Sequence, residues 1–277
     1  MRLVAVAAAA ALLAGCSNGA DPSPAAPSPT PSVTATAGVV AGDPTSLVRA
    51  SADAARREAG AAYTFLLAGR SAPNAPVDRI SGVGRIDLVT DTAATRGDFG
   101  LASEGRQYDV VTRGTLYWLS VPPRYRTGYV KTPWVSTTLT SARLGMSTLG
   151  HPGTYLDLLR GASAMSLAGT EDVRGVTARH YTGRILASDF LGALPAGLRD
   201  GTRAAFAGVA EVHLEVWLDP QGRPWRVRSR ATVGRTEVES AFDVTRYGPV
   251  ATVTVPDQVT PLPRVETALQ AAGVGTR

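Results

Sequence analysis

The chain has 277 residues, among them 28 basic and 23 acidic side chains, which give a formal net charge of +5. The arginines alternate with glutamates and aspartates, and no basic cluster is interleaved with aromatic residues. This distribution argues against nucleic acid as a partner. Cys16 is the only cysteine, which excludes an intramolecular disulfide and a cysteine-based metal site.

The N-terminus has the three parts of an export signal. Arg2 supplies the positive charge, residues 3–13 form an apolar run, and Leu-Ala-Gly-Cys at 13–16 ends it with small residues. The run is shorter than the roughly 20 residues that a membrane-spanning helix needs. It therefore predicts a removable signal peptide over residues 1–15 rather than a membrane span. The last four residues resemble the lipobox of bacterial lipoproteins, which implies that Cys16 becomes the lipid-bearing first residue.

Residues 16–42 combine this cysteine with a stretch rich in Pro, Ser, Thr and Ala. Such a composition buries too little apolar surface to offset the entropy lost on ordering. We therefore expect a disordered, extended tether between a membrane anchor and a domain over residues 43–260, followed by a C-terminal tail at 261–277.

The domain opens with a helix and continues mainly as strands. Asp43 and Pro44 are typical of an N-cap and a first helical residue, and apolar residues then recur at helical spacing up to Gly60. Alternation and turn residues predict strands and a hairpin, in chain order, at 62–69, 80–89, 94–101, 108–112, 116–121, 165–169 and 178–184. Residues 122–150 are expected to be irregular. Short helices are expected at 154–160, 188–194 and 195–206, before a final meander at 210–247.

The final meander fixes its own register. A four-residue loop at 220–223 and a two-residue turn at Gly234-Arg235 set which positions face one another. The resulting cross-strand pairs are Glu215–Arg228, Arg230–Glu239, Arg226–Asp243 and Ser229–Ser240. Charged groups then share one face and apolar groups the other, and a slip of one residue would bury every arginine. The sequence therefore predicts an antiparallel sheet with one solvated face.

The apolar face of this sheet must be buried against other elements, and the short helices are the ones available to pack on it. We therefore predict an α+β fold, a strongly curved antiparallel half-barrel with short helices packed in its concave face.

Three ordered motifs carry a resemblance to a known family. They are Val-Arg-Gly-Val at 173–176 with His180-Tyr181, the run 216–224 (VWLDPQGRP), and Tyr-Gly-Pro-Val at 247–250 leading to Val255-Pro256. With these, residues 45–256 resemble the mycobacterial-type lipoproteins of the LppX/LprG group, which share the half-barrel of the LolA and LolB carriers. The preponderance of arginine over lysine is what we expect of a high-GC actinobacterium. The resemblance implies a hollow that binds acyl chains of envelope lipids or glycolipids.

No catalytic or metal-binding pattern accompanies these motifs. His151, His180 and His213 have no ligand spacing, and we interpret each as structural or solvated. Gly82-Val83-Gly84 lacks the third glycine of a dinucleotide loop, and Ser163 lacks the flanking glycines of a nucleophile elbow. We expect no enzyme activity and no cofactor.

The candidate ligand site is the inner face. A Ser229–Ser240 pair beneath the helices would leave room, so a ligand chamber would be bordered by Leu159, Leu214, Val227, Ser229, Ser240 and Phe242. The same residues could equally form an ordinary filled core. Two functions stay open: a lipid-binding lipoprotein anchored to the outer side of the cell membrane through Cys16, or a non-enzymatic sensor or scaffold that grips an envelope protein.

Overall fold

The computed structural model describes residues 42–70, 78–98, 105–126, 128–138, 151–194 and 196–274. The expected signal peptide, Cys16 and all but the last residue of the tether lie outside these ranges. None of the helices in the described ranges is long and apolar enough to cross a membrane.

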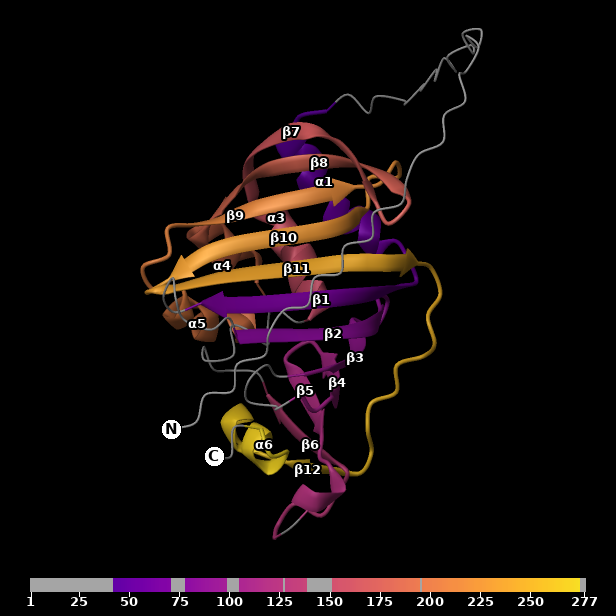
Figure 1. The fold of residues 1–277 in the computed structure, drawn as a ribbon, viewed down its shortest axis with the longest axis vertical. Helices are drawn as coiled ribbons and strands as arrows, with labels where there is room; N and C mark the ends of the chain where they lie inside the picture. Colours follow the sequence, from indigo (N-terminus) through magenta and orange to yellow (C-terminus); the bar gives the residue numbers. More distant parts are fainter. Residues whose placement is uncertain are drawn as a thin grey trace, which may run out of the picture. The chain divides into compact units, whose positions relative to one another are not determined.

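Within these ranges, twelve strands form one open sheet in the order β12-β6-β5-β4-β3-β2-β1-β11-β10-β9-β8-β7 (Figure 1). All neighbours are antiparallel except β12 and β6. The strands are β1 (Gly60–Arg70), β2 (Asp78–Asp87), β3 (Thr92–Gly97), β4 (Tyr108–Arg113), β5 (Leu116–Ser120), β6 (Trp134–Thr138), β7 (Ala162–Val173), β8 (Val176–Leu186), β9 (Glu211–Leu218), β10 (Pro224–Val233), β11 (Thr236–Tyr247) and β12 (Val259–Pro261).

Short helices cover one face of this sheet, which confirms the predicted half-barrel. The helices are α1 (Pro44–Arg56), α3 (Pro152–Arg160), α4 (Ala187–Ala193), α5 (Ala196–Ala205) and α6 (Val265–Ala271), with a 3-10 turn η2 (Pro123–Tyr125). In Figure 1, α3, α4 and α5 lie behind the sheet. One core cluster joins α1, α3 and α4 to β1, β2 and β7–β11, and a second joins α6 to β4–β6.

The first helix begins as its sequence predicts. The Asp43 carboxylate accepts a hydrogen bond from the Ser46 backbone N–H at 2.8 Å, and Pro44 occupies the first turn. This cap satisfies one of the N–H groups that a helix N-terminus leaves without a partner. The buried stripe of α1 includes Val48, Ala52 and Ala55, all fully inaccessible, so small side chains let the helix approach the sheet closely.

The register of the last three strands is as predicted. Glu215 pairs with Arg228, Arg230 with Glu239, and Arg226 with Asp243. The Arg226 guanidinium binds the Asp243 carboxylate through two contacts of 2.7 and 2.8 Å. The opposite face carries a buried apolar row on β9, namely Val212, Leu214, Val216 and Leu218. A bulge between Pro224 and Arg226 is the one departure from the predicted β9–β10 pairing.

The sequence-based boundaries miss three elements. Residues 122–150 were expected to be irregular, yet β6 lies within them, and the expected tail at 261–277 includes the end of β12 and all of α6. Leu262, Ala268 and Ala272 are buried against β4–β6. The second core cluster thus includes residues as far as Val274.

His151 caps α3 from a buried position. Its Nδ1 accepts the Gly153 backbone N–H at 3.0 Å, and Asp91, Asp157 and Arg56 surround the ring. Burial lowers the pKa of His151 below 6.5, although the neighbouring carboxylates act in the opposite direction.

Acid should therefore weaken the fold partly through His151. The unfolded chain binds this proton more readily than the folded one, so the contribution is complete above about pH 6.5 and is lost as pH falls. We expect His151→Asn, which keeps an N-cap acceptor, to show a smaller fall in melting temperature between pH 7 and pH 5. Burial raises the pKa of Asp157, whose effect has the opposite sign, so the comparison with the variant isolates His151. Identical pH profiles for the two proteins would contradict this assignment.

Candidate functional site

The six residues predicted to border a ligand chamber all lie on the inner face, and all are buried. Leu159 comes from α3, Leu214 from β9, Val227 and Ser229 from β10, and Ser240 and Phe242 from β11. The four apolar members belong to the same core cluster. The fold thus brings the predicted set together.

Phe242 lies at the centre of this set. Its ring stacks on Tyr155 of α3 with centroids 5.0 Å apart, and Tyr63 of β1 lies at the same distance on a tilted plane. The Tyr63 hydroxyl shares a 2.6 Å hydrogen bond with Thr95, so its polar end is satisfied. Burial raises the pKa of both tyrosines well above the usual range, so both rings stay neutral.

The serine pair is one of the polar features of the inner face. Ser229 and Ser240 face one another across β10 and β11, and their hydroxyl oxygens lie 2.6 Å apart. The same cross-strand row continues through Leu214 to Gly183 on β8, where an added Cβ would lie 2.5 Å from the Met165 sulfur. Three of these four inward positions therefore carry a hydroxymethyl group or no side chain.

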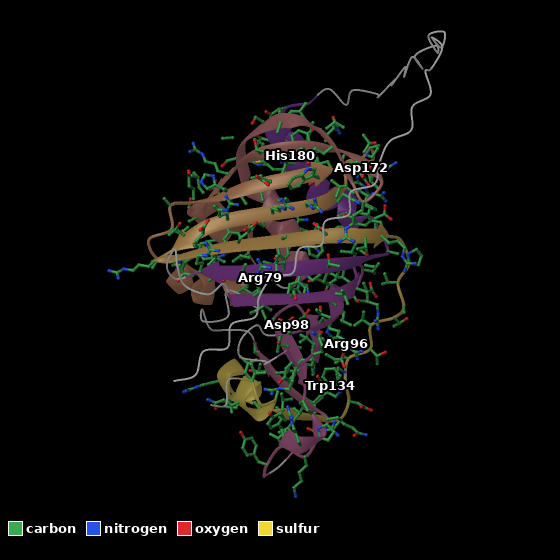
Figure 2. All side chains as sticks on the ribbon, viewed as in Figure 1. Arg79, Arg96, Asp98, Trp134, Asp172 and His180 are labelled. Carbon is green, nitrogen blue, oxygen red and sulfur yellow. The ribbon has the colours of Figure 1, made fainter. Side chains whose placement is uncertain are left out.

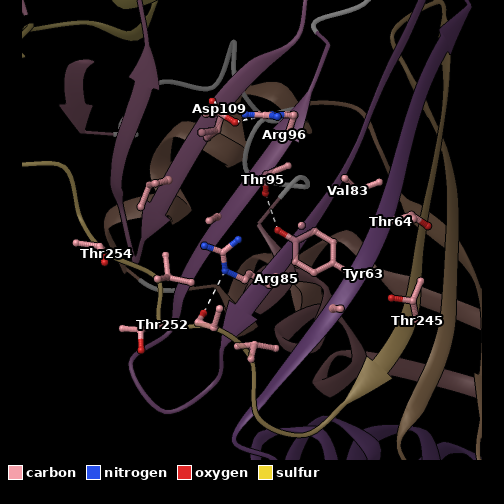
Figure 3. Close-up of a pocket in the computed structure, with 18 of the residues that line it drawn as sticks. Tyr63, Thr64, Val83, Arg85, Thr95, Arg96, Asp109, Thr245, Thr252 and Thr254 are labelled. Carbon is pink, nitrogen blue, oxygen red and sulfur yellow. Dashed lines mark hydrogen bonds and ion pairs between the residues drawn. The ribbon is translucent and has the colours of Figure 1, made fainter. Parts of the chain in front are cut away.

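A second feature, which the sequence did not predict, lies on the outer face. A pocket of about 920 Å³ lies against β1–β4, below the extended segment that joins β11 to β12 (Figure 3). Its outward-facing lining includes Val83, Arg85, Ala94, Arg96, Asp109 and Arg246. None of the six predicted chamber residues borders it.

The outer face also buries an aromatic residue. Trp217 of β9 is 3% exposed because His180 stacks on it at 4.1 Å and the guanidinium groups of Arg226 and Arg228 lie over its ring. Glu171 accepts from the Trp217 indole N–H at 2.9 Å and lies 2.8 Å from His180 Nδ1. The bond from Trp217 is the main cause of the lowered pKa of Glu171, with His180 contributing. His180, labelled in Figure 2, thus has a packing role.

The motif at 216–224 stabilises the loop between β9 and β10. Asp219 is 1% exposed and accepts from the backbone N–H groups of Gln221 and Arg223, which closes the loop between β9 and β10. The Arg223 guanidinium bonds to Asp219 and to Glu58 after α1, at 2.7 and 2.6 Å. These contacts tie the loop to the end of the first helix.

The remaining histidine lies where the register placed it. His213 faces Arg230 on the exposed side of the sheet. Within the described part of the chain, no three His, Cys, Asp or Glu residues gather in a way that could hold a metal ion.

No protein-family model matches the chain, and no curated protein matches it either. Among solved structures, lipoprotein LppX of Mycobacterium tuberculosis is similar at 15% identity and a TM-score of 0.49, over 76% of this chain and 97% of that one. LprF of Mycobacterium bovis is similar at 11% identity and a TM-score of 0.44, over 77% of this chain and 96% of that one. A LolA superfamily protein of Nitrosomonas europaea is similar at 9% identity and a TM-score of 0.35, over 77% of this chain and 96% of that one.

The half-barrel is similar to theirs. At such identities the similarity concerns the fold alone, so the function has to be argued from the residues of this chain.

Proposed function

We propose that this chain is a membrane-anchored, extracytoplasmic lipoprotein that binds the acyl chain of a lipid or glycolipid, without enzymatic activity. The anchor would be Cys16, reached through the proline-rich tether. The ligand would lie on the inner face of the half-barrel, between the sheet and the short helices.

The observation that carries this proposal is the composition of the inner face. The sheet is open, its concave side is apolar over β9–β11, and separate helices of 13 residues or fewer cover it. The row across β11, β10, β9 and β8 carries small residues at Ser240, Ser229 and Gly183, with Leu214 between the last two. Apolar walls with few polar groups are typical of small-molecule sites. Short helices could separate from such a row to admit a chain more easily than a second sheet could.

A bulky substitution in this row tests the proposal. Ser229→Trp should fill the space that an acyl chain would occupy and abolish recovery of bound lipid, with little change in melting temperature. Arg230→Trp is the matched control, because the neighbouring side chain points outward and is 59% exposed. It should retain the lipid.

The opposing model is a filled core. There the same substitution would be overpacking, which costs at least about 1–3 kcal/mol. A Ser229→Trp protein that unfolds, or that retains as much lipid as Arg230→Trp, would therefore refute the proposed chamber.

A further inference from the structure

The outer-face pocket has a floor of alternating large and small side chains. Across neighbouring strands the positions Arg246, Ala62, Arg85, Ala94 and Val111 follow one another in a single row. They face away from the core, since their chain neighbours Ile86, Ala93 and Ala61 are buried in it. Adjacent strands lie about 4.8 Å apart, so the Cα atoms of Arg85 and Arg246 are about 10 Å apart with only a methyl group between them.

The charge of this pocket is not balanced. Arg96 is paired with Asp109 through two contacts of 2.7 and 3.0 Å, so these two charges cancel. The Arg85 Nε donates to the Ala251 carbonyl at 3.1 Å, which is a neutral partner. No hydrogen bond or ion pair joins Arg246 to the described residues. The guanidinium groups of Arg85 and Arg246 therefore border the pocket without a carboxylate partner.

The cover of the pocket is the extended segment between β11 and β12. Figure 1 shows it running from the end of β11 down past β2–β4 to β12. Val250 packs on the start of β1, because an added Cβ at Gly60 would lie 2.7 Å from its Cγ2. Val253 is half-buried, whereas Thr252 and Thr254 are exposed, and all three border the pocket. The pocket thus has apolar side chains at Ala94 and Val111 on its floor and at Val250 and Val253 on its cover, and its two guanidinium groups without a carboxylate partner lie toward the β11 end of the row.

We propose that this pocket binds an anionic amphiphile. A phosphate or carboxylate would lie between Arg85 and Arg246, whose planar donor groups suit such oxygens. Its apolar chain would then pass Arg85 and follow Ala94 and Val111 beneath Val253. The volume of about 920 Å³ is within the roughly 300–1,000 Å³ of ligand pockets. This site is on the opposite face of the sheet from the proposed acyl chamber and does not depend on it.

Calorimetry with decyl phosphate, below its micelle concentration, tests this site on the full chain carrying Cys16→Ala. Arg246→Gln should weaken binding about tenfold or more, as expected for the loss of one charge-assisted bond. Arg246→Gln leaves the Arg85–Ala251 bond intact, so the cover stays in place. Arg235→Gln, in the exposed turn between β10 and β11, removes the same charge elsewhere and should have no effect.

Three further ligands separate the contribution of the anionic group from that of the apolar chain. Decanoate should bind and show the same dependence on Arg246, whereas inorganic phosphate and the neutral octyl glucoside should bind far more weakly. Equal binding of inorganic phosphate would overturn the role of the apolar floor. Binding of decyl phosphate that is unchanged by Arg246→Gln and abolished by Ser229→Trp would place the amphiphile on the inner face, and would overturn the outer site without affecting the proposed function.

Discussion

Replacing Cys16 with alanine should move the protein out of the membrane fraction, or leave it there as an uncleaved precursor. The Cys16 sulfur is the atom that would carry diacylglycerol, and the chain has no second cysteine. A single acyl chain gives only marginal membrane binding, whereas two chains give a stable anchor, so losing the thiol removes both at once. Cell fractionation with labelled fatty acid measures the change.

Ser17→Ala is the matched control for this experiment, since it alters the next residue and leaves the thiol in place. It should be labelled and fractionate as the parent does. A Cys16→Ala protein that is cleaved normally and stays in the membrane would contradict the lipoprotein assignment.

Truncating Phe242 to alanine should produce the largest loss of stability among the inner-face residues. The ring lies against both Tyr63 and Tyr155 and is 3% exposed, so its removal leaves a cavity in the main core cluster. Burying and packing a phenylalanine in this way is worth about 3–5 kcal/mol. Chemical denaturation should show this as a lower midpoint with an unchanged slope.

Val83→Ala provides the comparison, because Val83 is on the outer face and 57% exposed. It should change stability by less than about 0.5 kcal/mol. A loss below about 1 kcal/mol for Phe242→Ala would mean that the ring borders open space rather than packed atoms.

The sheet register and the inner-face set could be predicted because local chemistry determines them. Turn lengths at 220–223 and at Gly234-Arg235 specify which residues pair, and charge alternation on β9–β11 excludes the shifted register. The Ser229–Ser240 contact and the burial of Phe242 follow from that register. The inner-face position of Leu159 followed from the need to cover the apolar face.

The elements that escaped prediction depend on distant pairing. β12 pairs in parallel with β6, where Val259 lies beside Trp134, and no turn links segments so far apart in the chain. Helix α6 has few large apolar residues, so its burial against β4–β6 could be found only once those strands were in place. The outer pocket was missed for the same reason, because residues 250–254 cover strands β1–β4, which come much earlier in the chain.

The central claim is that the inner face holds an acyl chain, and native mass spectrometry of the protein from its own membrane tests it most directly. The account predicts a mass excess beyond the Cys16 anchor, equal to one lipid per chain. Arg230→Trp should retain this excess and a folded Ser229→Trp should lose it. Wild-type protein that carries only its anchor would contradict the account.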